Sequence, residues 1–544
     1  MLTDQSGLSP FERLLTVFTR VRPGEGRSTF LFFLHGFLLL FSYMIVKALR
    51  EAFILTDFSA EVRAYGVAVI ALVLMFVVPA YSAVRRRLDG ARLLQAVTVF
   101  FALNMLTFAA TAYFGISTSF TFFVWVSIFG VMMIAQFWAF AADTFNLKSG
   151  QRLFPVIMMG ANLGALAGAK FAQLAVGALQ PVGLMFVATA VLLSTVVLAY
   201  PAHARVPEGS RATTPEHGGK PARLLGGIEL VLRDRYLLLI ALFVVLLNWI
   251  NSTGEFVLAD MVTRHADAQV AASAGTVTKG ELITAFYGNF QFWVTLVGLA
   301  IQLLLVARVY RWVGVRGALI VLPVVAALGY GLIVFVPIFS IIQLVKIAEN
   351  SVNYSLMNTT RHALFLPVDR DAKYEGKTAI DTFFWRFGDL IQAGVVFAGL
   401  NWLNWTAAQF AMLNLALAVA WIGLAVAIGR EFRVLAQRNV INVAPEAGQP
   451  IPDLLYDPGR PFRHLVPEDA FRDADPGDVL NLTARLPGGQ ALPKWVQFDA
   501  RRRAFLGTCP DGYCEEVTVE VVASDVDGMQ AASLFVMRRS VLTD

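Results

Sequence analysis

The strongest constraint in this sequence is a succession of apolar runs, each about 20 residues long, that continues to about residue 428. A run of that length is what a helix needs to cross the hydrocarbon core of a bilayer. With 57% hydrophobic and only 15% charged residues, the chain has more apolar side chains than a soluble core of this size can bury. The sequence therefore predicts an all-α polytopic membrane protein over this region.

The apolar runs predict about twelve membrane-spanning helices in two halves of six. The first half, 30–200, has spans near 30–46, 65–84, 93–114, 120–141, 154–176 and 182–200. The second half, 236–428, has spans near 236–258, 282–306, 316–336, 338–357, 379–400 and 407–428. Two six-helix halves are the plan of major-facilitator-like transporters, whose substrate sites lie between the halves near the middle of the membrane.

Basic residues are concentrated in alternate connections between the predicted spans. They gather at 85–92, 148–152, 211–223, 308–311, 370–373 and 430–438, whereas the loops after residues 114, 176, 336 and 400 carry essentially none. Because loops rich in Lys and Arg stay in the cytoplasm, both termini are predicted to be cytoplasmic, with the chain in a cell inner membrane. This topology also accounts for the net charge of +5, so no nucleic-acid partner is predicted.

The remaining segments are more polar than the predicted spans. Residues 1–29 form an N-terminal segment, 201–235 a cytoplasmic linker between the halves, and 429–449 a second linker. In the tail, 450–544, the share of Asp, Glu, Pro and Gly rises, and stretches such as VTVEVVAS (Val517–Ser524) and 533–539 alternate in the way strands do. The tail is therefore predicted to be a small all-β sandwich.

Ionisable side chains within the predicted spans are the most informative residues, because an unpaired charge at membrane depth costs roughly 3 kcal/mol or more. In the first span, Lys47, Arg50 and Glu51 lie on one helical face together with Tyr43. Two cations beside one carboxylate predict an anion-binding face. The alternative is a helix end whose cations reach up to lipid headgroups.

Three spans of the second half carry polar faces of the same kind. The seventh has Asn248, Asn251 and Glu255; the tenth has Lys346, Glu349, Asn350 and Asn353; the eleventh has Lys377, Asp381, Arg386, Asp389 and Gln392. Polar groups at three- and four-residue spacing predict helices that line a water-filled path. The alternatives are polar packing between helices for the seventh span and purely structural ion pairs for the other two.

Signals for other chemistry are weak. The segment GANLGALAGAK (160–170) lacks the preceding strand and the ending of a phosphate-binding loop, and its small-residue spacing predicts close helix packing instead. The six His show no metal-ligand spacing and no nucleophile pairing, and both cysteines, Cys509 and Cys514, lie in the tail. We therefore predict no catalytic residues, no metal site, no cofactor and no enzyme activity.

Two longer blocks resemble the ATP/ADP translocases of plastids and intracellular bacteria. They are FWAFAADTFNLKSGQRLFPVIMMGANLGALAGA (137–169) and NYSLMNTTRHALFLPVDRDAKYEGKTAID (353–381). Together with YMIVKALREAFILT in the first span, the resemblance covers roughly residues 30–430. It implies a nucleotide antiporter in which Lys47, Arg50, Glu255 and Lys377 stand at positions that handle the nucleotide. Asn162 and Arg361 are further substrate-binding candidates within the two blocks.

The chain departs from that family at two positions and adds a domain. The fourth span has no acid where the family has a Glu, and Asp389 stands in place of a lysine. Residues 492–528 look like part of a dystroglycan-type cadherin-like domain. Three functions therefore remain open: exchange of nucleotides or related phosphorylated anions, proton-coupled transport of another solute, and a membrane anchor or sensor that presents the tail to a protein partner.

Overall fold

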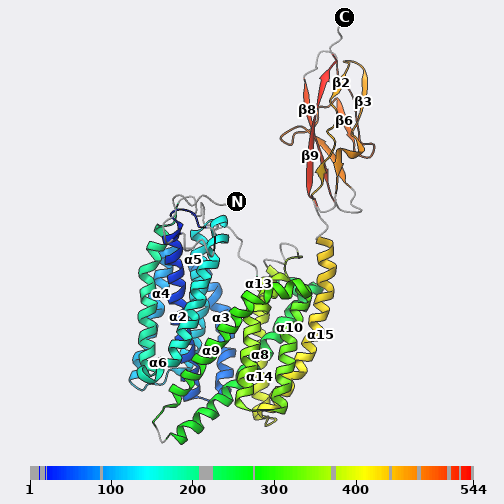
Figure 1. Ribbon diagram of the computed structural model, residues 1–544. Helices are drawn as coiled ribbons and strands as arrows, with labels where there is room; N and C mark the ends of the chain where they lie inside the picture. Colours follow the sequence, from blue (N-terminus) through cyan, green and yellow to red (C-terminus); the bar gives the residue numbers. More distant parts are fainter. Residues whose placement is uncertain are drawn as a thin grey trace. The chain divides into compact units, whose positions relative to one another are not determined.

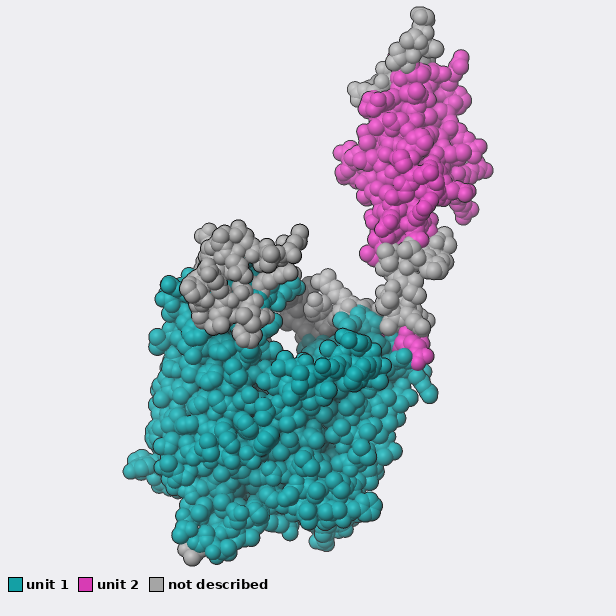
Figure 2. Space-filling model, viewed as in Figure 1, with its two compact units in different colours: residues 1–432 teal, residues 433–544 magenta. Residues whose placement is uncertain are grey.

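The computed structural model describes residues 12, 19, 21–85, 90–207, 224–273, 276–368, 375–439, 444–473, 480–510, 516–525 and 528–540. The chain divides into two compact units, residues 1–432 and 433–544 (Figure 2). Many of the basic residues behind the orientation prediction, at 86–87, 211–223 and 370–373, lie outside the described residues.

Five helical elements build the first half of the membrane unit (Figure 1). They are α2 (Glu25–Asp57), α3 (Ala60–Arg85), α4 (Gly90–Tyr113), α5 (Ser119–Thr144) and α6 (Leu147–Ala204). The long α6 contains two of the predicted spans, because Gln180 leaves the helical region with φ 59° and ψ 163°. Pro181 follows at once and has no amide hydrogen to continue the helical bonding. The chain therefore breaks between the predicted fifth and sixth spans.

The second half contains shorter helical pieces. They are α7 (Leu224–Arg233), α8 (Arg235–Ala272), α9 (Lys279–Leu304), α10 (Val306–Phe335), α11 (Phe339–Val352), η2 (Asn353–Met357), α12 (Asn358–Ala363), α13 (Lys377–Ala379), η4 (Ile380–Phe384), α14 (Trp385–Asn401) and α15 (Ala407–Asn439). Both η2 and η4 are π-helices, so the predicted tenth and eleventh spans each cross one wide turn.

Ten helices within the described residues are long and apolar enough to cross a membrane. The break in α6 and the consecutive run of α11, η2 and α12 account for the two predicted spans that do not form separate long helices. The prediction of an all-α polytopic membrane protein is confirmed, and the chain is a multi-pass membrane protein.

A stripe of glycines joins α6 to α2. Gly160, Gly164 and Gly168 lie at four-residue spacing, and a Cβ on each would strike a backbone carbonyl of α2, at Phe33, Phe37 and Phe41 respectively. Without side chains between them, the two helices approach until their backbones are in contact. The small residues at 160–168 therefore pack helices, as the sequence predicted.

The two halves contact each other near one end of the helices. Asn401 at the end of α14 donates to Glu61 at the start of α3 with 2.8 Å between Nδ2 and Oε1, and Gln180 in the break of α6 donates to Glu281 of α9. Toward α13 the helices of the two halves diverge, and the surface of the unit is hollowed between them (Figures 1 and 2). In the part of the chain that the structure describes, the membrane unit is therefore closed at one end and hollowed at the other.

The second unit is a β-sandwich. One sheet has the order β2–β9–β8–β5 and the other β3–β7–β6, and β1 pairs with β4. The elements are β1 (Glu446–Ala447), β2 (Leu454–Tyr456), β3 (Pro461–Leu465), η5 (Glu468–Ala470), β4 (Phe471–Arg472), β5 (Asn481–Arg485), β6 (Val496–Asp499), β7 (Ala504–Thr508), β8 (Val517–Ser524) and β9 (Gln530–Arg539). Val521 and Phe535 from the first sheet and Phe505 from the second share one buried core. The predicted all-β tail is confirmed.

Enlarging Gly164 is expected to disrupt the first half, because the backbone of α2 cannot move aside as a side chain could. We expect Gly164→Leu to cost about 3 kcal/mol or more, the upper part of the range for overpacked cores. Gly177→Leu is the control, since nothing lies within 4 Å of a Cβ built there. The yield of monodisperse protein and its melting temperature in detergent are compared between the two variants. An equal fall of yield and melting temperature in both variants would contradict the close contact of α6 with α2.

Candidate functional site

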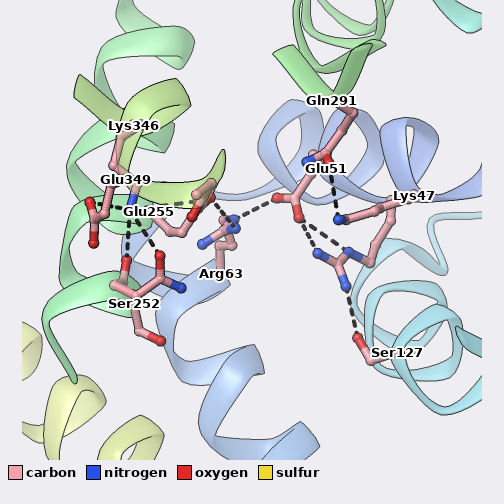
Figure 3. A network of polar contacts seen from close by, with 12 residues as sticks. Lys47, Glu51, Arg63, Ser127, Ser252, Glu255, Gln291, Lys346 and Glu349 are labelled. Atoms are coloured by element: carbon pink, nitrogen blue, oxygen red, sulfur yellow. Dashed lines mark hydrogen bonds and ion pairs between the residues drawn. The ribbon is translucent and has the colours of Figure 1, made fainter. Parts of the chain in front are cut away.

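A chain of ion pairs begins in the first half, where the end of α2 faces the start of α3 (Figure 3). The Arg50 guanidinium pairs with Glu51 and donates to Oγ of Ser127 on α5 at 2.9 Å. The second oxygen of Glu51 accepts from Nε of Arg63 at 2.5 Å. The Glu51 and Arg63 side chains are only 4% and 6% exposed, so each charge depends on its partner for compensation.

Arg63 continues this series of ion pairs into the second half. Its Nη2 lies 3.6 Å from Oε2 of Glu255 on α8. The other oxygen of Glu255 accepts from Nδ2 of Asn350 on α11 at 2.9 Å and lies 3.8 Å from Nζ of Lys346. One guanidinium therefore faces a carboxylate from each half of the membrane unit.

Lys346 ends the chain of ion pairs inside the second half. Its side chain is 0% exposed, and Nζ lies 2.9 Å from Oε2 of Glu349 and 3.1 Å from Oδ1 of Asn251. The Tyr330 hydroxyl donates to Oε2 of Glu349 at 2.9 Å. Residues that the sequence placed on the polar faces of the seventh and tenth spans thus meet in one place.

The central network, which comprises these ion-paired residues and Lys47, carries a formal charge of +1. Its cations are Lys47, Arg50, Arg63 and Lys346, and its carboxylates are Glu51, Glu255 and Glu349. Lys47 contacts the amide oxygen of Gln291 on α9 at 3.1 Å, and within the described part of the chain no carboxylate lies at ion-pair distance from it. Excess positive charge away from bulk water favours an anion, especially one that accepts several hydrogen bonds.

A second cationic group lies where α12 approaches η4. Arg361 Nη2 and Lys377 Nζ contact the two oxygens of Asp381 at 2.8 and 2.5 Å. The Arg361 guanidinium also lies 4.5 Å from the centre of the Trp385 ring. Two cations share one carboxylate here, so this outer cluster of Arg361, Lys377 and Asp381 also has a formal charge of +1.

The third charged group ties α14 to α8. Asp389 lies 3.4 Å from Nη1 of Arg386 and accepts from Oγ of Ser252 at 2.9 Å, and its side chain is 4% exposed. One turn away, Asn248 donates to the backbone oxygen of Trp385 at 2.8 Å. These contacts suit a structural joint between two helices.

A model of the TLC ATP/ADP transporter family matches residues 117–432, more than half of the chain. The chain belongs to this family. The matched region holds Glu255, Lys346 and Lys377 and begins after α2 and α3, which supply Lys47, Arg50 and Arg63. The resemblance to ATP/ADP translocases is therefore confirmed at the level of the family.

Two curated carrier proteins are similar in sequence to this chain. The ADP,ATP carrier protein 1 of Chlamydia pneumoniae is 26% identical over 51% of this chain and 60% of the carrier. Its counterpart in Chlamydia muridarum is 25% identical over 51% of this chain and 58% of the carrier. The chain thus spans about three fifths of the length of these relatives.

Two solved structures share the fold of the membrane unit. A mutant of the nucleoside transporter NupG has a TM-score of 0.53 at 11% identity, over 75% of this chain and 99% of that one. An auto-inhibited peptide transporter of the POT family has a TM-score of 0.52 at 12% identity, over 76% and 97%. The major-facilitator-like fold is confirmed. For the tail, a putative Ig domain model matches residues 444–540.

The structure places most of the predicted site residues in these three groups. Lys47, Arg50 and Glu51 meet Glu255, Lys346 and Glu349 in the central network, whereas Lys377 and Arg386 each pair elsewhere. Within the described residues, Asn162 and Asn353 take part in no side-chain hydrogen bond or ion pair with these groups. Asn353 is buried at the start of η2, and Asn162 is half-buried in α6.

Sequence reasoning missed Arg63, which links the two halves through its ion pair with Glu255. It lies two positions before the predicted second span, 65–84, and therefore counted as part of a loop. In the structure α3 begins at Ala60, so Arg63 is already in the first turn of the helix. An arginine in that turn, beside an acid at the end of the preceding helix, is the signal that could have identified it.

Removing the Arg63 side chain is expected to destabilise the protein. Breaking a buried pair leaves an uncompensated charge, and because Glu51 keeps Arg50 we expect Arg63→Met to cost about 3 kcal/mol, the lower end of the usual range. Arg233→Met breaks an exposed pair with Glu229 and should cost under about 1 kcal/mol. Melting temperatures in detergent compare the two, and a smaller loss for Arg63→Met than for the control would contradict the buried link.

Proposed function

We propose that this chain exchanges nucleotides, such as ATP and ADP, or related phosphorylated anions, by alternating access between its two halves. The observation that carries the proposal is the central network, which has a net positive charge and is shared between α2, α3, α8 and α11. A site built from both halves is what alternating access requires, because the substrate must contact each half in turn. Membership of the TLC family supports the nucleotide as substrate class.

Each charge in the central network has a part in this scheme. Lys47 and Arg50 attract phosphate oxygens, since both are partly accessible and, among the described residues, Lys47 donates only to the amide oxygen of Gln291. Glu51 and Glu255 hold Arg50 and Arg63 in place when the site is empty. An anion that takes over the cations weakens these internal pairs, so binding energy is used to loosen the contact between the halves.

The outer cluster is proposed as the place where the anion first binds. Lys377 and Arg361 are partly exposed, at 29% and 13% of their side chains, and share Asp381 as partner. The alternation of basic loops supports a cytoplasmic position for this end of the unit and for both termini, in a cell inner membrane. Arriving nucleotides would meet two cations before they reach Lys47.

Uptake of labelled ATP into proteoliposomes tests the exchange directly. We expect uptake when the vesicles contain ADP and little uptake when they contain buffer alone, because an exchanger needs a substrate on the other side. No flux of ATP, ADP or any other nucleotide with purified, folded protein would contradict the proposed function.

Lys377 separates a binding role from a structural one in the same assay. Lys377→Ala should reduce uptake without reducing the amount of folded protein, because Asp381 keeps Arg361 as its partner. Exchanging the charges, Lys377→Asp with Asp381→Lys, is the matched control, since a merely structural pair tolerates the exchange and a binding site does not. Uptake restored by the charge exchange would contradict the binding role.

Proton-coupled transport of another solute is the second candidate. The observation that favours it is Asp389, a carboxylate buried in α14 that is 3.4 Å from its cation and accepts from Ser252. Buried carboxylates within membrane helices are where proton relays are found. Transport driven by a pH gradient, unaffected by internal nucleotide and lost in Asp389→Asn, would favour this candidate over nucleotide exchange.

A further inference from the structure

Tyr354 is the exception among the residues of the wide turn in the tenth span. Its side chain is 56% exposed, whereas Asn353, Ser355, Leu356 and Met357 of the same π-helix, η2, are all buried. A π-helical turn holds more residues than an α-helical one and interrupts regular packing, and such turns occur often at functional sites. Here the wide turn packs four side chains and leaves one aromatic ring uncovered.

The uncovered ring faces the other half of the membrane unit. Lys47 Nζ, from α2 in the first half, lies 5.9 Å from the centre of the Tyr354 ring. Tyr354 therefore lies where the two halves face each other, with more than half of its side chain uncovered.

An uncovered aromatic ring beside a cationic network suits a ligand with one flat and one anionic part. Aromatic rings of proteins stack on nucleobases whatever the base, because every base has a π-face. The Lys47 ammonium and the Arg50 guanidinium suit phosphate oxygens. Phosphate groups alone would need only the cations, so the ring points to the aromatic part of the ligand.

We propose that Tyr354 is the platform on which the base of a nucleotide stacks while its phosphates contact Lys47 and Arg50. This inference rests on the proposed function and adds how the substrate is oriented between the halves. Because an aromatic ring stacks on every base, Tyr354 favours nucleotides over phosphate ions that carry no base. It does not discriminate among the bases.

Binding of ATP and of tripolyphosphate to the purified full-length protein tests the stacking role. Tripolyphosphate offers the same anionic chain without a base. We expect Tyr354→Ala to weaken ATP binding by about 10- to 100-fold and to leave tripolyphosphate binding unchanged. Retained tripolyphosphate binding shows that Tyr354→Ala folds, and Tyr354→Trp should keep the affinity for ATP. Phe76→Ala is a control, because Phe76 is 76% exposed and lies about 20 Å along α3 from Arg63.

The outcomes distinguish the two proposals. Equal weakening of ATP and tripolyphosphate in Tyr354→Ala, or no weakening of either, overturns the stacking role and leaves nucleotide exchange standing. Failure of the unaltered protein to bind ATP or ADP overturns the proposed function and the stacking role with it. Loss of ATP binding in Tyr354→Ala and Tyr354→Trp alike, with tripolyphosphate still bound, also contradicts stacking, since tryptophan provides a ring of the same kind.

Discussion

The contact of Arg63 with Glu51 and Glu255 is the interaction on which the membrane unit depends. Neither carboxylate belongs to the helix of Arg63, and one comes from each half. A charge buried between helices is stable only while its partners stay close. Separating the halves at this point breaks the contact of Arg63 with Glu255 and leaves each of them with the partners of its own half. Under the proposed function, an anion that binds Arg50 or Lys47 competes for these pairs, so the same contact would close the halves and respond to the substrate.

The second requirement is that each half is rigid. A change in the contacts between the halves can move a whole half only if its helices move together. The glycine stripe of α6 brings its backbone against α2, so Lys47 and Arg50 sit on a helix that is held along much of its length. In the second half, the two π-helices interrupt α-helical packing next to Tyr354 and Asp381. Irregular turns thus hold two of the proposed substrate contacts, whereas the part of α6 that packs against α2 is regular helix.

Hydropathy predicted the spans well because the thickness of a bilayer fixes the length of a helix that crosses it. Alternation also predicted β8 with the bounds Val517–Ser524. The site was harder to predict, because helical spacing shows which residues share a face but not how deep they lie or which helix they meet. Lys377 and Lys47 were therefore grouped from sequence, yet they lie in different clusters, and Arg63 was lost at the edge of a span.

The central claim is that a nucleotide between the halves loosens the contact at the closed end. The side chains of Glu61 and Asn401 are joined by a hydrogen bond of 2.8 Å at this end. Replacing both residues by Cys, in a protein whose Cys509 and Cys514 are replaced by Ser, makes the separation of the halves measurable. A short bifunctional thiol reagent should cross-link the two introduced cysteines readily in the empty protein and more slowly when ATP or ADP is bound. A rate of cross-linking that bound nucleotide leaves unchanged would contradict the account.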